Sequence, residues 1–354
     1  MHLPIGHSSM SDIQTDYDAL LVISFGGPEG PEDVIPFLEN VLRGRNVPVE
    51  RMIEVAEHYQ AFGGVSPING NCRALVSALQ TELATAGLQL PVYWGNRNWH
   101  PMLADTLRQM RDDGIKRALA FVTSAYSSWS SCRQYLGDIE QARREVGDGA
   151  PQIDKLRTFY NHPGFIEPMR DSLKSAAQQI DDSRHPTTVV VYTAHSIPTG
   201  MADGCTYQAQ LEDACGLVAE TVPQLRWQLV YQSRSGPPTQ SWLEPDICDH
   251  LHQLQHEGST TDVIICPIGF TSDHMEILFD LDSEAQQACD QLGITMQRTP
   301  TAGTDPRFIR MVCDLSLERI SSSDRLSLGE RGPGHDVCPA DCCPSGQPTG
   351  PPPD

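Results

Sequence analysis

The sequence predicts an α/β fold of two doubly wound, Rossmann-like halves, each with a parallel sheet, and a central cleft between them. Short apolar runs rich in β-branched residues alternate with longer amphipathic segments along the whole chain, as expected for strands covered on both faces. The intervening segments are long enough for helical crossovers between parallel strands. A chain of 354 residues can also bury a substantial core, which favours two halves.

Each half is expected to contribute four strands. They are residues 19–25, 90–95, 117–125 and 153–159 in the first half, and residues 188–193, 227–232, 262–268 and 294–298 in the second. Helical patterns cover residues 35–42, 50–62, 69–86, 102–113, 163–180, 204–221, 245–257 and 305–320, and one more helix begins near Met275.

Composition divides the chain into four parts. Residues 1–16 have the character of a flexible leader, residues 17–165 and 166–322 form the two halves, and residues 323–354 form a tail rich in Pro, Gly and Cys. No apolar run approaches the roughly 20 residues of a membrane span, and the first residues lack the regions of a secretory signal. We therefore expect a cytoplasmic protein without a transmembrane segment.

The charge balance restricts the partners. Asp and Glu number 46 against 25 Lys and Arg, a formal net charge of -21, which argues against nucleic acid as a partner and is compatible with cations. The Gly-rich turn GGPEGPE after the first strand matches neither GxGxxG nor GxxxxGK[ST]. The turn therefore does not favour a phosphate-binding loop.

Residues 266–282, CPIGFTSDHMEILFDLD, indicate a site more clearly than any other stretch. A strand ends here and a helix begins, and ligands of open α/β sheets bind beyond the carboxyl ends of strands, where His274 and Glu276 fall. These two can converge on one ligand only if His274 precedes the helix. Glu276, Asp280 and Glu284 are spaced i, i+4 and i+8, which predicts one acidic helix face.

Two interpretations of this stretch are open. In one, Asp273 and His274 cap a helix and the acidic face meets water. In the other, imidazole and carboxylates hold a divalent cation in transit, a donor set that suits ferrous iron. His195, just after the strand at 188–193, could alone be a core histidine. Two histidines at equivalent strand ends favour a site shared with Glu276.

Side chains near strand ends of the first half suit a flat, apolar ligand. YSSWSSCRQY supplies small hydroxyls and aromatic rings, among them Tyr135, although a Ser-rich helix start with core aromatics fits the same residues. Arg43 and Arg45 follow the predicted helix at 35–42. They either complement the helix dipole or hold carboxylates of a ligand at the mouth of a site.

Three of the 11 cysteines, Cys338, Cys342 and Cys343, are clustered in the tail. In a reducing compartment, clustered thiols indicate a soft-metal or iron–sulfur site. Adjacent cysteines seldom bind one ion together, so a two-iron cluster fits better, with Cys132 or Cys205 as the fourth ligand. The alternative is a disordered tail with incidental thiols. The other six cysteines are expected to be reduced thiols: Cys72, Cys215, Cys248, Cys266, Cys289 and Cys313.

Five motifs, in the family's order, resemble the ferrochelatase family: YDALLVISFGGPEGPEDV, GGVSPIN, VYTAHSIP, WQLVYQSRSGPP and CPIGFTSDHMEILFDLD. The resemblance runs from about Tyr17 to Ile320. NRNWHP, AYSSWSSC and the cysteine-bearing tail are similar to the actinobacterial branch. The resemblance implies a class II chelatase-like fold and an enzyme that inserts its substrate metal, Fe2+, into coproporphyrin III to give Fe-coproporphyrin III on the route to haem b.

The resemblance also implies site residues. The family's metal-site histidine and carboxylate fall on His195 and Glu276, which are thereby implied as catalytic residues and Fe2+ ligands. The SDHxE histidine falls on His274, and the family's acidic ladder on Glu276, Asp280 and Glu284. His274, Asp280 and Glu284 are thereby implied as a metal relay. Arg43 and Arg45 would meet the propionates of the porphyrin.

Further porphyrin contacts are implied for Ser66 in GGVSP and Tyr135 in CRQY. Phe25 stands where some bacterial members have a tyrosine that ligates product iron; since a phenyl ring cannot ligate, the product is expected to be held differently. Some members carry a [2Fe-2S] cluster on three C-terminal cysteines and one from the body. The C-x3-C-C spacing here differs from that of the animal enzymes, whose internal cysteine is Pro168 in this chain. Cys205 stands where Asp is usual.

Other functions remain open at this stage. One is a ferrochelatase for protoporphyrin IX, and another is a cobalt-inserting sirohydrochlorin enzyme, although those lack the TSDHxE context. A non-catalytic class is a two-lobed haem- or iron-binding protein whose iron–sulfur tail senses iron. Haem-pathway enzymes that act before and after this chain are expected partners.

Overall fold

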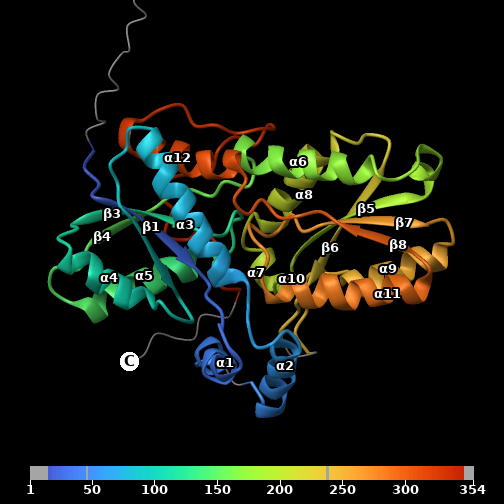
Figure 1. Cartoon of the computed structure of the whole chain (residues 1–354), viewed down its shortest axis with the longest axis horizontal. Helices are drawn as coiled ribbons and strands as arrows, with labels where there is room; N and C mark the ends of the chain where they lie inside the picture. The colour runs from blue at the N-terminus through green and yellow to red at the C-terminus, as the bar shows by residue number, and fades with distance from the viewer. Residues whose placement is uncertain (1–14, 45–46, 237–238, 347–354) are drawn as a thin grey trace, which may run out of the picture.

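The computed structural model describes residues 15–44, 47–236 and 239–346, and within them two four-stranded parallel sheets form the frame (Figure 1). The first sheet has the order β2-β1-β3-β4, with β1 (Ala19–Ser24), β2 (Val92–Asn96), β3 (Arg117–Val122) and β4 (Gln152–Lys155). The second has the order β6-β5-β7-β8, with β5 (Thr188–His195), β6 (Arg226–Gln232), β7 (Asp262–Cys266) and β8 (Thr295–Arg298). The predicted α/β class with parallel sheets is confirmed.

The strand orders explain where a ligand can bind. In the first sheet, β2 lies on one side of β1 and β3 lies on its other side, so the direction in which strands are added reverses between β1 and β3. In the second sheet, β6 and β7 flank β5 in the same way, and the reversal falls between β5 and β7. Ligands of open α/β sheets bind at such reversal points, beyond the carboxyl ends of the strands. His195 ends β5, and His274 follows β7, so both predicted histidines flank the reversal point of the second sheet.

Helices cover both faces of both sheets. One hydrophobic core lies between the two halves and joins side chains of both sheets to four helices: α3 (Ile68–Thr85), α6 (Pro163–Ala177), α8 (Tyr207–Ala219) and α12 (Pro306–Ser321). The opposite face of the first sheet packs on α4 (Leu103–Asp112) and α5 (Gln134–Val146). The opposite face of the second packs on α9 (Ile247–Glu257), α10 (Met275–Phe279) and α11 (Gln286–Leu292). The boundary at residue 165 and the central cleft stay predictions.

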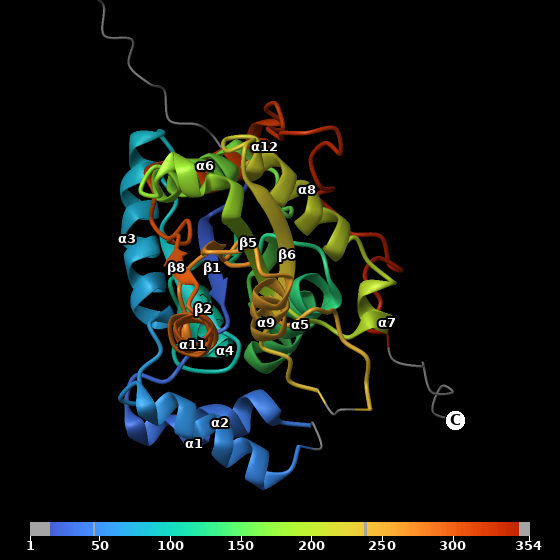
Figure 2. The same cartoon turned by 90° about the vertical axis from the view of Figure 1, so that its right-hand side faces the viewer.

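Two helices lie outside these layers. Figure 2 shows α1 (Val34–Leu42) and α2 (Val49–Ala61) projecting from one end of the molecule, and they pack on each other through a small core of their own, formed by Val34, Phe37, Leu38 and Ala56. The remaining helical elements are short: η1 (Pro31–Asp33), the π-helical turn η2 (Trp129–Arg133), η3 (Asp182–Thr187), α7 (Thr199–Ala202) and the π-helical turn η4 (Asp280–Ala285).

Two element predictions need correction. The strand expected at 153–159 ends at Lys155, and the single helix expected from Met275 is divided by η4 into α10 and α11. The tail forms neither helix nor strand over residues 323–346 but is tied to the body: the Arg157 guanidinium donates to the Leu326 carbonyl oxygen at 2.8 Å and the Asn161 amide to the Gly332 carbonyl oxygen at 2.9 Å. Among the described residues, no helix has the length and hydropathy to cross a membrane.

Candidate active site

The two predicted histidines lie on either side of one carboxylate. His195 Nε2 is 3.6 Å from Oε1 of Glu276, and His274 Nδ1 is 3.9 Å from Oε2 of the same residue. The Glu276 side chain is 45% exposed and that of His195 is 35% exposed, so an ion from solvent can reach both. The structure thus brings together the three donors that the sequence indicated for a metal.

Local backbone geometry produces this convergence. His274 is the N-cap of α10 with extended backbone (φ −147°, ψ −178°), so it precedes the helix as the sequence analysis required for His274 and Glu276 to meet. His195 is oriented by its own strand end: its Nδ1 donates to the Ser196 carbonyl oxygen at 2.5 Å, which leaves Nε2 directed toward Glu276. The Tyr207 hydroxyl donates to the His195 carbonyl oxygen at 2.9 Å.

Electrostatics make His195 and Glu276 an ion pair that shares one proton. Burial opposes charge on both groups, but the Glu276 carboxylate raises the pKa of His195 to about 9, and the His195 imidazolium lowers the pKa of Glu276 to about 2. For His274, burial is the largest cause and lowers the pKa. Near neutral pH, His195 is therefore the charged histidine and His274 the neutral one.

The acidic residues continue from Glu276 along the helix. Asp280 accepts hydrogen bonds from the Gln232 amide at 3.1 Å and from the Ser233 hydroxyl. Burial first, and then the Glu276 carboxylate, raise the pKa of Asp280 to about 7, while burial and Asp246 raise the pKa of Glu284. The predicted acidic series is electrostatically linked, but it runs through a π-helical turn rather than a regular α-helix.

The predicted porphyrin contacts of the first half lie around the end of β1. Phe25, 37% exposed, follows that strand, and Ser66 is buried, with its backbone N–H donating to the Pro28 carbonyl oxygen at 2.9 Å. Tyr135 is also buried. Arg97, which the sequence analysis did not single out, joins two of them: its guanidinium carbon is 5.7 Å from the centre of the Phe25 ring and 5.0 Å from that of Tyr135.

Helix α2 connects this wall to the histidines, which the sequence analysis also missed. The His58 ring stacks on Phe279 of α10 at 3.7 Å between ring centres. Burial, and then the Glu276 carboxylate, raise the pKa of Tyr59. Helical periodicity alone could not find these contacts, since they join segments about 200 residues apart. Arg43 is exposed and donates to the Asn40 side chain, and Arg45 lies outside the described residues.

The tail cysteines meet one of the two predicted body cysteines. The Cys132 sulfur accepts hydrogen bonds from the thiols of Cys338 and Cys343, which lower the pKa of Cys132. Cys342 Sγ lies 3.4 Å from Cys343 Sγ. Cys205, the other candidate, donates to the Ala202 carbonyl oxygen at 3.6 Å. The remaining six cysteines are free thiols, as predicted.

These features define a class: a two-lobed α/β protein that presents imidazole and carboxylate donors at strand ends and a second, sulfur-rich donor group on its tail. The chain belongs to the ferrochelatase family, which it matches over residues 17–320. It is therefore a metal-inserting lyase, and the predicted family and enzyme class are confirmed.

Relatives extend this result over nearly the whole chain. A ferrochelatase of Rhodopirellula baltica is 57% identical over 328 residues, 92% of this chain and 93% of that protein. A coproporphyrin III ferrochelatase of Streptomyces coelicolor is 50% identical over 359 residues, 94% of each chain. Among solved structures, SirB from Bacillus subtilis with Fe3+ has a TM-score of 0.55 at 10% identity, covering 86% of this chain and 96% of that chain, a likeness of fold.

Proposed function

We propose that this chain inserts ferrous iron into coproporphyrin III and releases Fe-coproporphyrin III for haem b synthesis. The observation that carries the proposal is the convergence of His195 and His274 on the Glu276 carboxylate at the reversal point of the second sheet. Relatives named coproporphyrin III ferrochelatase, 48% and 50% identical over most of the chain, support the choice of porphyrin.

Insertion exchanges one Fe2+ for two pyrrole protons, and the site residues divide this work. Fe2+ displaces the proton that Glu276 and His195 share, and that proton leaves to solvent on the exposed side of the pair. Both then serve as iron ligands, an oxygen and a nitrogen donor suited to Fe2+. When the iron passes from these ligands to the ring nitrogens, Nε2 of His195 is free to accept one of the two pyrrole protons, and the other leaves along the acidic residues that follow Glu276. His274, neutral near pH 7, supplies a second nitrogen donor beside Glu276.

The acidic residues beyond Glu276 carry charge away from the ring. Asp280, with a pKa raised to about 7, changes protonation near neutral pH and so can take up and release protons. Glu284 extends the same route, and both carboxylates suit an incoming hydrated cation. The wall formed by Phe25, Ser66 and Tyr135 would contact the macrocycle and hold it bent, so that pyrrole lone pairs face His195. Arg43 and Arg45 would meet the propionates.

We further propose that the tail binds a [2Fe-2S] cluster through Cys132, Cys338, Cys342 and Cys343. The donor set fits such a cluster. Cys338 and Cys343 contact the Cys132 sulfur, and Cys342 Sγ adjoins Cys343 Sγ. The adjacent cysteines, Cys342 and Cys343, can each bind a different iron. Such a cluster supplies a one-electron centre when bound. Arg133, which donates to the Cys342 carbonyl oxygen at 2.8 Å, holds the tail against η2, where Cys132 lies. Cys205 would stay outside the ligand set.

Two finer assignments complete the proposal. The free thiols of the described residues suit a reducing compartment, which supports a cytoplasmic location. Coproporphyrin III must be made by another enzyme, and its iron complex must be converted further to reach haem b. We therefore expect this chain to receive its substrate from one haem-pathway enzyme and to pass its product to another.

The direct test compares two porphyrins under anaerobic conditions with ferrous iron. Steady-state kcat/KM is measured with coproporphyrin III and with protoporphyrin IX, by the change of the porphyrin absorption spectrum. The proposal predicts multiple turnovers and a clear preference for coproporphyrin III. A preference for protoporphyrin IX would contradict the choice of substrate, and stoichiometric binding without turnover would instead identify a non-catalytic haem- or iron-binding protein.

A further inference from the structure

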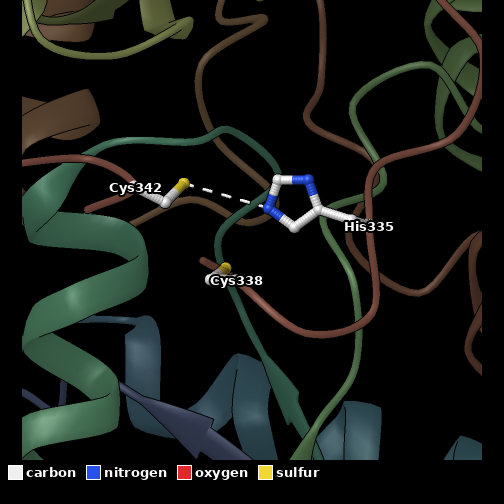
Figure 3. A group of neighbouring side chains, drawn as sticks. All are labelled: His335, Cys338 and Cys342. Atoms are coloured by element: carbon white, nitrogen blue, oxygen red, sulfur yellow. Dashed lines mark hydrogen bonds between the residues drawn. The ribbon is translucent and has the colours of Figure 1, made fainter. Parts of the chain in front are cut away.

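His335 lies beside the tail cysteines, and neither the sequence analysis nor the proposed cluster uses it. Its Nε2 is 3.8 Å from Cys342 Sγ, and the ligand atoms of His335, Cys338 and Cys342 all lie within 4.8 Å of one another. Figure 3 shows the imidazole edge turned toward the Cys342 sulfur, with Cys338 close by. An imidazole at this distance can bind a metal directly or donate to a sulfur that does.

The backbone around His335 is held in place. Arg325 donates to the Gly334 carbonyl oxygen and forms an ion pair with Asp336 at 3.2 Å, so both neighbours of His335 are tied to one guanidinium. Gly334 packs so closely on Thr158 that an added Cβ would lie 2.7 Å from the threonine hydroxyl oxygen. The position of His335 is therefore set by contacts with the body and the preceding chain.

The sulfur contacts place His335 near one iron of the proposed cluster. Adjacent cysteines bind different irons, so Cys342 and Cys343 are divided between the two. Cys132 contacts both Cys338 and Cys343, but sharing an iron with Cys338 would leave the adjacent cysteines together on the other iron. Cys132 and Cys343 are therefore assigned to one iron, and Cys338 and Cys342 to the second. These are the two sulfurs that His335 adjoins.

We infer that His335 donates a hydrogen bond from Nε2–H to the Cys342 sulfur when the cluster is bound, and that this bond raises the reduction potential of the cluster. The inference rests on the [2Fe-2S] proposal above. Four sulfurs already complete the ligand set, so the imidazole acts from outside it. An N–H group directed at a ligand sulfur offsets part of the negative charge added on reduction, and such bonds are among the features that set cluster potentials.

Three variants test the inference in the full-length protein purified anaerobically. His335→Phe keeps an aromatic ring without a donor, His335→Gln keeps an N–H donor, and His252→Phe changes an exposed histidine on α9 as a control. The readouts are iron content, absorption, and the midpoint potential from a redox titration followed by electron paramagnetic resonance. We expect a more negative midpoint for His335→Phe, an intermediate one for His335→Gln, and the wild-type value for His252→Phe.

Each other result is decisive. Equal midpoints for wild type and His335→Phe at equal cluster content overturn the inference. Loss of the cluster in both His335 variants, or a strong nitrogen coupling in pulsed resonance spectra of the wild type, identifies His335 as a ligand and overturns the hydrogen bond. A wild type without a cluster refutes the [2Fe-2S] proposal first, before any variant is made. Iron insertion, assayed in parallel, separates these outcomes from failure of the proposed enzymatic activity.

Discussion

Arg97 shows how one residue can organise a ligand-binding wall. Its side chain is only 10% exposed, lies against the rings of Phe25 and Tyr135, and pairs with Asp138 at 3.0 Å. A cation between two aromatic rings fixes both of them, since each ring face attracts the guanidinium. Phe25, the exposed member, is thereby held at the end of β1 in position to meet a ligand.

Replacing Arg97 by Met should weaken porphyrin binding more than it slows the chemical step. Without the cation, the Phe25 ring can move, and the Asp138 carboxylate loses its partner, which should cost about 1–3 kcal/mol of folding stability. We expect KM for coproporphyrin III to rise by roughly tenfold, as a loss of about 1.4 kcal/mol in binding would give. Steady-state kinetics and denaturant unfolding measure the two effects.

Arg108→Met is the matched control, because Arg108 forms an exposed ion pair with Asp105 on the surface of α4. Its KM and unfolding free energy should equal those of the wild type within error. An unchanged KM in Arg97→Met would show that the cation does not position the wall.

At the scale of elements, the strand ends and helix starts determine which side chains meet. The N-cap position of α10 puts His274 in extended backbone. The π-helical turn η4 begins at Asp280, whose carboxylate accepts hydrogen bonds from Gln232 and Ser233. Turns of this kind occur often at functional sites because they shift side chains out of helical register. Within the described residues, both π-helical turns carry proposed site residues, Cys132 in η2 and Asp280 in η4.

The start of α6 gives the protein an acid-sensitive element. His162 is buried, caps α6 by accepting a hydrogen bond from the Gly164 backbone N–H at 3.0 Å, and has a pKa lowered to about 3, chiefly by burial and then by Arg157. The unfolded chain, with an ordinary histidine pKa of about 6.5, therefore binds a proton that the folded protein excludes. Stability should fall by up to about 1.4 kcal/mol per pH unit as pH drops below about 6.5 toward 3.

His162→Asn keeps a cap acceptor and removes the titrating group. Unfolding free energies measured between pH 7 and pH 5 should therefore depend less steeply on pH in the variant than in the wild type. Equal slopes would mean that His162 does not contribute to the acid sensitivity.

The fold was predictable from local pattern, whereas the breaks in it were not. Alternation of β-branched runs with amphipathic segments predicted the eight strands, most clearly the central strands β1, β3, β5 and β7, which are buried along nearly their whole length and are therefore largely apolar. The division of the helix after Met275 had no local signal, since residues 280–285 are compatible with a continuous α-helix. The π-helical turn comes with contacts to distant strands, of Asp280 with Gln232 at the end of β6 and of Asp282 with Arg298 of β8. The early end of β4 likewise reflects pairing with β3.

Part of the candidate site was likewise predictable from local pattern, and part of it was not. His195, His274 and Glu276 were predictable because strand ends of parallel sheets lie at one edge. Arg97, Tyr59 and His335 were not, since their roles depend on contacts between distant segments, and an isolated Arg, Tyr or His resembles many others in a sequence. For the tail, composition indicated metal-binding thiols but left Cys132 and Cys205 open, and the contacts of Cys338 and Cys343 favour Cys132.

At the scale of the whole molecule, the two sheets share one core and the C-terminal region returns to the first half. Helix α12 follows the second sheet in sequence but packs on α3 and α6, and its Glu318 forms a bidentate ion pair with Arg157, at 2.7 and 2.8 Å, just after β4. Both side chains are 1–2% exposed. This buried pair ties the chain that leads into the tail to the first half of the molecule, where Cys132 lies in η2.

Breaking this pair should destabilise the whole protein. Glu318→Ala leaves the Arg157 charge buried without its carboxylate partner, a change that costs about 3–5 kcal/mol in comparable cases. Denaturant unfolding measures the loss. The double variant Arg157→Met/Glu318→Leu removes both charges and should recover most of the stability. A single variant within about 1 kcal/mol of the wild type would rule out this pair as a main tie between the halves.

The most direct test of the whole account is the anaerobic rate of ferrous iron insertion into coproporphyrin III by His195→Ala and Glu276→Gln, with Glu257→Gln on the surface of α9 as control. If these two side chains bind the iron and exchange its charge for protons, each variant should lose roughly 100-fold or more in kcat/KM while remaining folded. The control should match the wild type. Activity of either site variant within about twofold of the wild type would contradict the assignment of this imidazole–carboxylate pair as the centre of the reaction.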